Sequence, residues 1–101
     1  MNTFVRLNLI FPPSLETAVT EALIDDPTMP GFTLLHAEGH SSDFSHTSAR
    51  ERVRGRIERR VLWVVIERER LEQVLAVLHE RVASAEVRWW TDPVLALGRL
   101  A

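Results

Sequence analysis

The chain has 101 residues, of which 46% are hydrophobic and 26% charged, and it carries a formal net charge of −2. We expect residues 1–101 to form one globular domain, and the slightly acidic balance argues against a nucleic-acid binder, which needs a basic surface. Cysteine, lysine and tyrosine are absent, which excludes disulfides, thiolate or Schiff-base catalysis, and a P-loop.

The first part of the chain predicts a strand, a helix and a second strand. Residues 3–11 place their apolar side chains alternately on two faces, as a strand does, and two prolines then end the pattern. Ser14 is suited to cap a helix, in which apolar residues recur at helical spacing as far as Leu23. A turn leads into a second strand over residues 32–40. Because the N-terminus lacks a basic stretch followed by a long apolar run, we expect no signal peptide and a cytoplasmic location.

The second part of the chain predicts a third strand, a helix and a fourth strand. Residues 61–66 (VLWVVI) are apolar at every position, which favours a central strand buried on both faces. Residues 68–83 carry one apolar stripe at helical spacing. Residues 86–91 predict the last strand, which an Asp-Pro pair should end. An apolar tail, VLALGRLA (residues 94–101), follows and could dock on a neighbour.

The predicted order of strand, helix, strand, strand, helix and strand is the ferredoxin-like βαββαβ pattern. It implies an α+β fold with a four-stranded antiparallel sheet and two helices on one face. Trp89 and Trp90 are adjacent in the last strand, so one should pack under the helices and the other should lie on the bare face. A large exposed apolar face normally marks an interface, so we expect a homo-oligomer with cyclic symmetry. No run is long enough to span a bilayer, so we expect the chain not to be embedded in a membrane.

The connection between the second and third strands is too long for an ordinary hairpin. It reads GHSSDFSHTSARERVRG (residues 39–55). His40, Asp43 and His46 lie close together in it, and two imidazoles with a carboxylate suit a divalent metal such as Zn²⁺, Ni²⁺, Co²⁺ or Cu²⁺. Tetrahedral zinc needs three or four ligands, however, and solvated loops are also rich in these residue types. The pattern leaves two interpretations open, a metal site and a solvated connection.

The end of this connection is strongly basic. Every second residue is an arginine, namely Arg50, Arg52, Arg54 and Arg56. In an extended chain these four side chains share one side, which suits phosphates or an acidic partner. Gly55 lies among them, where a backbone could approach a ligand closely. The alternative is a solvated stem whose charge is offset by neighbouring acidic residues.

No residue pattern in the chain indicates catalysis. The serines of the long connection have no recognisable nucleophile motif around them, and the carboxylates are scattered over predicted helix faces. We interpret His36 and His79 as surface or packing residues. We therefore expect that the protein is not an enzyme.

The order of elements and the position of the long connection resemble the PII-like superfamily, which includes the nitrogen-regulatory PII proteins and the CutA proteins. The resemblance covers residues 1 to about 92, and the segment 41–55 lies where PII proteins carry their T-loop, a flexible arm that reports ligand state to partners. The ending PVLALGRL and the sequence VRGR at residues 53–56 look closest to a small, uncharacterised PII-like family. Members of that family are often encoded beside heavy-metal efflux pumps of the resistance-nodulation-division type.

The chain also departs from the nitrogen-regulatory PII proteins, which hold an adenine nucleotide between subunits. Those proteins use a glycine-rich loop after the second helix, a T-loop lysine and a uridylylated tyrosine, whereas here the corresponding loop is ASAE and both residue types are absent. The residues that the resemblance leaves for gripping an anionic ligand are Gly39, Arg54, Gly55, Arg56 and Arg99. The resemblance therefore leaves the ligand open between a divalent metal and an adenine nucleotide.

The resemblance implies a homotrimeric regulatory or sensor protein. It would bind a small ligand or a divalent metal in a cleft between subunits and signal through the segment 41–55 to a membrane transporter or another regulated protein. The setting that it implies is metal homeostasis or transport. One alternative is a CutA-like metal-binding protein that uses His40, Asp43 and His46 directly as ligands, and another is an accessory subunit of an oligomeric enzyme.

Overall fold

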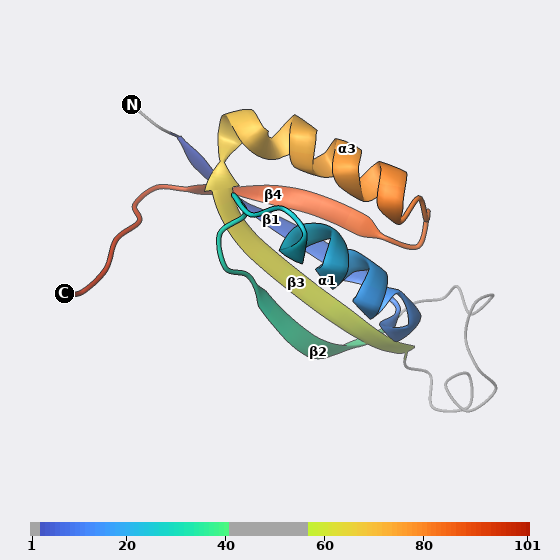
Figure 1. The fold of residues 1–101 in the computed structure, drawn as a ribbon. Coiled ribbons are helices and arrows are strands. Elements are labelled where there is room, and N and C mark those ends of the chain that lie inside the picture. The colour runs from blue at the N-terminus through green and yellow to red at the C-terminus, as the bar shows by residue number, and fades with distance from the viewer. Residues whose placement is uncertain (1–2, 41–56) are drawn as a thin grey trace.

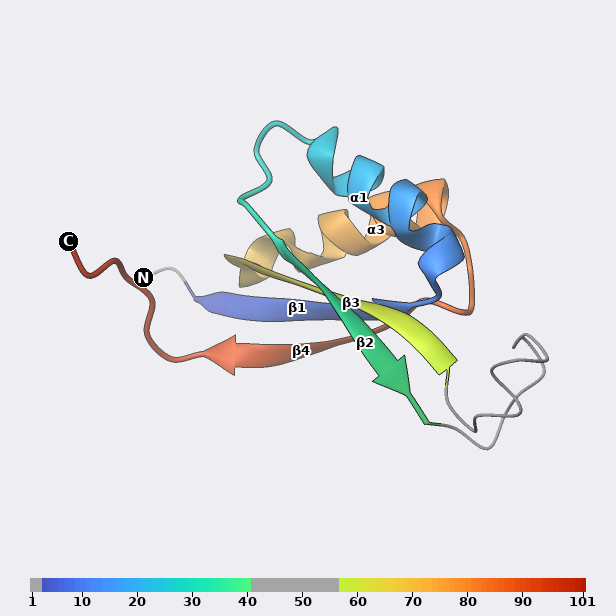
Figure 2. The ribbon, with the colours of Figure 1, turned by 90° about the horizontal axis from the view of Figure 1, so that it is seen from below.

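The computed structural model of the chain describes residues 3–40 and 57–101. Its elements are β1 (Phe4–Phe11), α1 (Glu16–Ile24), β2 (Thr33–Gly39), β3 (Ile57–Glu67), α3 (Leu71–Arg81) and β4 (Arg88–Val94), with short 3₁₀ turns at Pro13–Leu15 and Arg68–Arg70. The strands form one antiparallel sheet in the order β2-β3-β1-β4, and α1 and α3 lie on the same face of it (Figures 1 and 2). The predicted α+β fold with its ferredoxin-like order is confirmed.

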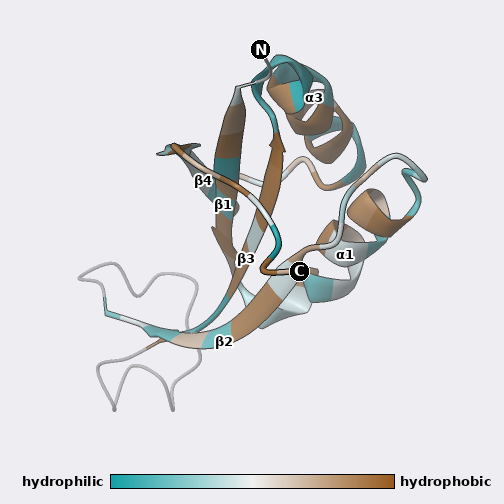
Figure 3. Ribbon diagram, turned by 90° about the vertical axis from the view of Figure 1, so that its left-hand side faces the viewer, coloured by the Kyte–Doolittle hydropathy of each residue, from teal (hydrophilic) through white to brown (hydrophobic). Residues whose placement is uncertain are grey.

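The hydrophobic core lies between the helices and one face of the sheet. It consists of alternate residues of the two central strands and the inner stripes of both helices, and Figure 3 shows hydrophobic residues concentrated along β1 and β3. The fully buried members include Leu7, Leu9, Phe11, Val19, Leu23, Leu62, Val64 and Ile66. This alternation places every second residue of β1 on the opposite face, which no helix covers.

The apolar stretch of β3 is buried on one face only in the single chain. Alternate residues from Leu62 to Ile66 belong to the core and are at most 2% exposed, whereas those from Val61 to Val65 lie on the open face and are only partly buried. The expectation of burial on both faces is therefore wrong for one chain. Both helices are on the same side of the sheet, so the second face of β3 has no layer above it among the described residues.

Both helices begin with a 3₁₀ turn and lack a side-chain cap. Leu15 occupies the N-cap position of α1, and no side chain forms a capping hydrogen bond there. The expectation that Ser14 caps this helix is wrong, because Pro13 has the φ angle that begins a helical turn and Ser14 already lies inside that turn. No helix within residues 3–40 and 57–101 is long and apolar enough to cross a membrane.

The last strand extends beyond its predicted end. Asp92 and Pro93 pair with Arg6 and Val5 of β1, and β4 ends only at Val94. Proline is tolerated because β4 is an edge strand, so a missing backbone N–H on its outer side interrupts no ladder. An Asp-Pro pair that normally ends a strand therefore continues it here.

Trp89 and Trp90 lie on opposite faces of the sheet, as the sequence predicts. Trp89 pairs with the core residue Leu9, and Trp90 pairs with Asn8 on the open face. They are 51% and 45% exposed, respectively. Trp89 therefore points to the helix side without being fully covered, because it belongs to an edge strand.

Candidate ligand site at the base of the long connection

The long connection leaves the sheet between β2 and β3. Gly39 ends β2 opposite Ile57, the first residue of β3, and His40 follows directly. The remaining residues predicted for this region, Asp43, His46, Arg54, Gly55 and Arg56, lie outside the described residues, as does the T-loop-like segment 41–55. The described part of the site is therefore the pair of strand ends from which the connection emerges.

Gly39 has a steric role in this strand pair. A Cβ atom at this position would lie 3.3 Å from Cγ of Arg59 and 3.5 Å from the carbonyl oxygen of Ile57. The side chain of Arg59 thus crosses the glycine closely, and any larger residue would push it aside. This close packing accounts for a glycine at the end of β2 independently of a ligand.

His40 has one described partner. Its Nε2 lies 3.1 Å from Oε2 of Glu38, and both side chains are largely exposed. Within residues 3–40 and 57–101, no group of three or more histidine, aspartate and glutamate side chains could hold a metal ion. A metal site at His40 would therefore need Asp43 and His46, and that set stays a prediction.

Arg99 does not approach Gly39 within one chain. It belongs to the tail after β4, which leaves the sheet where Val94 pairs with Phe4, whereas Gly39 lies at the end of the sheet where β3 begins. Figure 1 shows the C-terminus and the base of the connection on opposite sides of the molecule. Arg99 could therefore approach Gly39, the other described residue of the predicted ligand set, only from another chain.

A polar cleft of about 430 Å³ lies on β2 and β3 beside the base of the connection. Its lining residues are His36, Ala37, Glu38, Glu58 and Arg60. The register places His36 opposite Arg60 and Glu38 opposite Glu58, so four polar side chains form a square on one face of the strand pair. Nε of Arg60 donates a hydrogen bond of 2.7 Å to Oε1 of Glu16 at the start of α1.

The chemistry of this cleft is mixed. It offers carboxylates to a cation or a donor group, and a guanidinium and an imidazole to an anion or an acceptor group. Sequence reasoning interpreted His36 as a surface or packing residue and did not single out Glu58 or Arg60. These residues follow a period of two in the sequence, His-x-Glu before the connection and Glu-x-Arg after it. Because antiparallel pairing brings two such patterns together on one face, this period could have predicted the cleft.

A polar cluster lies in the centre of the open sheet face. Nδ2 of Asn8 donates to Oδ2 of Asp92 at 2.8 Å, and Nη2 of Arg6 donates to the same oxygen at 3.0 Å. The guanidinium carbon of Arg6 also lies 5.0 Å from the ring centre of Trp63, a cation–π contact. Asn8 is only 2% exposed although it is on the uncovered face. The face is thus apolar and aromatic around one ordered polar centre.

Comparison with known proteins identifies the family. All of residues 1–101 match the profile of a protein family of unknown function, DUF3240. The solved structure of a DUF3240 family protein from Shewanella baltica superposes with a TM-score of 0.80 at 21% identity and covers 100% of both chains. The structure of Arabidopsis thaliana PII bound to citrate superposes with a TM-score of 0.66 at 17% identity, over 92% of this chain and 78% of that one. No curated protein matches the chain.

These likenesses agree with the arrangement of strands and helices described above. At such identities the two solved structures show a shared fold, and they confirm the PII-like fold that the order of elements and the position of the long connection predicted. The family match extends over the whole chain, from residue 1 to residue 101. The chain therefore belongs to the DUF3240 family and has the fold of the PII-like superfamily.

Proposed function

We propose that this protein is a PII-like regulatory protein. It binds a small ligand or a divalent metal in a cleft between subunits and signals through the segment 41–55. The observation that carries the proposal is the PII-like fold with a long connection between β2 and β3, next to a polar cleft on the flanking strands. Metal homeostasis or transport is the setting that we propose, with a membrane transporter as one candidate for the regulated partner.

The open sheet face supports self-association. Around the polar cluster it carries Phe4, Val61, Trp63, Val65 and Trp90, all of them partly or largely accessible in one chain. A continuous apolar and aromatic face of this kind normally lies in an interface. We propose that three chains pack these faces around a three-fold axis, as cyclic symmetry would allow.

The position of Arg99 supports a ligand site shared between subunits. In one chain Arg99 lies at the end of the sheet remote from Gly39, and the polar cleft is lined by β2 and β3 alone. A neighbouring chain is the only source from which an Arg99 side chain could reach that cleft. A guanidinium is well suited to an anionic ligand because it donates paired hydrogen bonds to phosphate or carboxylate oxygens.

Two measurements test the proposal. Light scattering on the purified protein should give three times the 11.6 kDa mass of the chain, and a monomer would contradict the proposed site between subunits. A thermal-shift screen against adenine nucleotides and divalent metals should then find a compound that raises the melting temperature, because a ligand of the folded state stabilises it by mass action. If the protein is a trimer and neither adenine nucleotides nor divalent metals raise its melting temperature, the proposed trimer stands and both proposed ligand classes are contradicted.

The same screen separates the two ligand classes. If a divalent metal raises the melting temperature, a variant with both His40→Ala and His46→Ala should lose the shift, whereas His79→Ala, on α3 and away from the polar cleft, should retain it. That outcome would make the protein a CutA-like metal binder. A shift with a nucleotide that Arg99→Ala weakens would favour the intersubunit anion site.

A further inference from the structure

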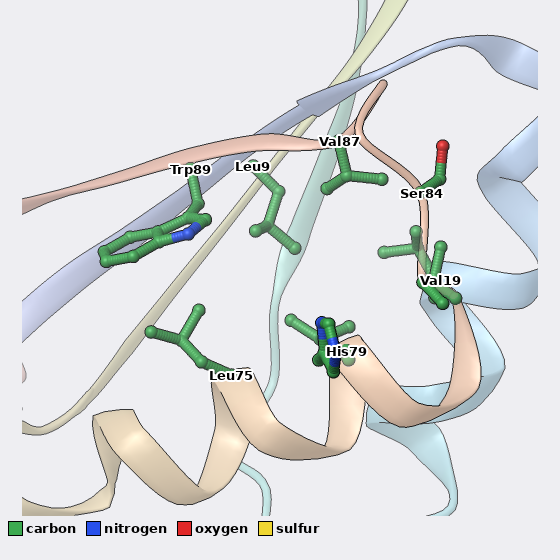
Figure 4. A pocket seen from close by; sticks show the side chains of 10 residues that line it. Leu9, Val19, Leu75, His79, Ser84, Val87 and Trp89 are labelled. Carbon is green, nitrogen blue, oxygen red and sulfur yellow. The ribbon is translucent and has the colours of Figure 1, made fainter.

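An apolar cavity lies between α3 and the edge strand β4, away from the polar cleft and the open face. Its volume is about 270 Å³, and Figure 4 shows side chains of both layers facing it. The lining residues are Leu9, Val19, Leu75, Leu78, His79, Val82, Ala83, Ser84, Val87 and Trp89. The half-exposed ring of Trp89 forms one wall, so the cavity opens to the surface beside β4.

The C-terminal tail is the most exposed apolar segment of the described chain. After Val94 it leaves the sheet as an extended segment that points away from the body of the molecule (Figures 1 and 2). Leu95, Leu97 and Leu100 are 96%, 61% and 109% exposed, respectively. Because removing apolar surface from water is favourable, three exposed leucines in one segment favour its docking on an apolar surface.

The direction of the tail turns it away from the cavity of its own chain. Val87 and Trp89 line the cavity at the beginning of β4, whereas the tail continues past the other end of that strand, at Val94. A tail that filled its own cavity would have to reverse direction and run back along β4. A second copy of the chain has no such constraint.

We propose that the C-terminal tail of one chain docks in the α3–β4 cavity of a second copy. In an extended segment Leu95 and Leu97 point to the same side, and both would enter the cavity together. An apolar cavity of about 150 Å³ holds a benzene molecule, so 270 Å³ suits two leucine side chains. The exposed carboxylate of Glu86, next to Val87 of the cavity, offers a partner for Arg99 of the incoming tail. A tail docked in this way holds Arg99 at Glu86, whereas a tail that supplies Arg99 to the polar cleft on β2 and β3 is undocked. The docking goes beyond the proposed function, because it needs association of chains but no ligand.

Because the chain contains no cysteine, a thiol cross-linker can join only cysteines that are introduced by substitution. A chain carrying Leu97→Cys and His79→Cys is treated with a short thiol-to-thiol cross-linker and run on a denaturing gel. Docking between copies predicts covalent dimers and higher multimers. A chain carrying Leu97→Cys and Glu72→Cys is the matched control, because Glu72 is an exposed residue of the same helix that does not line the cavity. It should give few multimers, as should Leu97→Cys alone.

Each outcome of the cross-linking test either supports or overturns the proposed docking. Multimers that form only with the Leu97 and His79 pair support docking between copies. A band of internally linked monomer would show that the tail folds back, and multimers no more abundant than in the controls would show that it does not reach the cavity. Either of these results overturns the proposal. If light scattering still gives an oligomer in that case, the proposed function through the open face is unaffected.

A second variant tests the energetics in the otherwise natural chain. Replacing Leu95 and Leu97 together with serine should weaken self-association, measured by sedimentation, by on the order of 100-fold, since each lost leucine contact is worth about tenfold. Ala96→Ser, on the other side of the extended tail, should leave it unchanged. An association constant that both variants leave intact would overturn the docking.

Discussion

At the scale of single residues, Asn8 is the most constrained polar side chain that the structure describes. It is 2% exposed, and its amide donates to Oδ2 of Asp92 at 2.8 Å and to the carbonyl oxygens of Arg6 and Trp90 at 3.2 and 3.4 Å. A buried amide needs such partners because it has lost its contacts with water. The hydrogen bonds therefore hold β1 and β4 in register from within the apolar face.

The first prediction concerns this amide. Asn8→Ala should lower the free energy of unfolding by about 1–3 kcal/mol, because Asp92 loses a buried donor. The measurement is a urea titration followed by tryptophan fluorescence. Thr33→Ala, an exposed residue of β2, should change stability by less than about 0.5 kcal/mol. Equal effects of the two substitutions would contradict the role assigned to Asn8.

Ala83 is constrained by its backbone conformation. It has a φ of 48°, in the left-handed region that a residue with a Cβ adopts only at a cost. It lies in the short connection between α3 and β4. The backbone turn that glycine would adopt freely is thus made here by alanine.

The second prediction follows from this turn. Ala83→Gly should raise the free energy of unfolding by up to about 1 kcal/mol, because relief of the steric cost exceeds the extra entropy of glycine in the unfolded chain. Urea titration measures it, with Ala76→Gly in α3 as a control that should lower stability by a similar amount. Destabilisation by both substitutions would show that the alanine turn is unstrained.

At the scale of elements, the end of α1 is tied to the start of α3 by one polar junction. Asp26 accepts hydrogen bonds from the hydroxyl and the backbone N–H of Thr28 at 2.7 and 2.9 Å, and Arg70 donates to Asp26 at 3.2 Å. The Thr28 hydroxyl contributes most to lowering the pKa of the Asp26 carboxyl, followed by the Thr28 N–H. The charge of Arg70 lowers it further, and together these outweigh desolvation.

The third prediction is a dependence of stability on pH. The pKa of Asp26 is lower in the folded than in the unfolded chain, so its contribution is fully present above the unfolded value of about 3.9 and is lost as the pH falls through the folded value. Asp26→Asn should lower the melting temperature at pH 7, and the difference from the natural protein should shrink below about pH 4. Melting curves recorded between about pH 2.5 and 7 measure this difference in melting temperature. A difference that does not vary with pH would contradict the assignment.

At the scale of the whole molecule, the two faces of the sheet differ in how far they are covered. The helices cover the central strands on one face, while the other face carries partly exposed valines and tryptophans around the Arg6, Asn8 and Asp92 cluster. Such a cluster in an apolar interface can select one arrangement of subunits over others, because a shifted arrangement leaves polar groups unpaired. The open face therefore suits a specific oligomer better than a nonspecific one.

The fourth prediction separates association from folding. Val65→Asp places a charge on the open face and should weaken self-association by about 100-fold or more, because the carboxylate would lose its hydration in the interface, and Arg6 opposite it is already engaged by Asp92. The secondary structure should persist, since Val65 is only partly buried in one chain. Sedimentation and circular dichroism measure the two effects. Ala76→Asp, on the exposed side of α3, should alter neither, and dissociation by both variants would argue against the open face as the interface.

Periodicity in the sequence determined the order of elements and the side of the sheet to which each residue points. The alternation in residues 3–11, and the opposite directions of Trp89 and Trp90, follow from local geometry that any strand obeys. The length of the connection after Gly39 likewise predicted the PII-like resemblance. The ends of elements were less predictable, as Ser14 and Pro93 illustrate, because strand pairing and the position of a proline in a turn decided them.

Only the tertiary structure decided which residues come together across the chain. Strand order placed Asn8 beside Asp92, and put Arg99 at the end of the sheet remote from Gly39. It also brought His36 opposite Arg60 in the polar cleft and left an unfilled cavity next to Trp89. The physical reason is that local periodicity fixes the direction of a side chain, whereas its neighbours depend on register and layer packing between segments that are far apart in sequence.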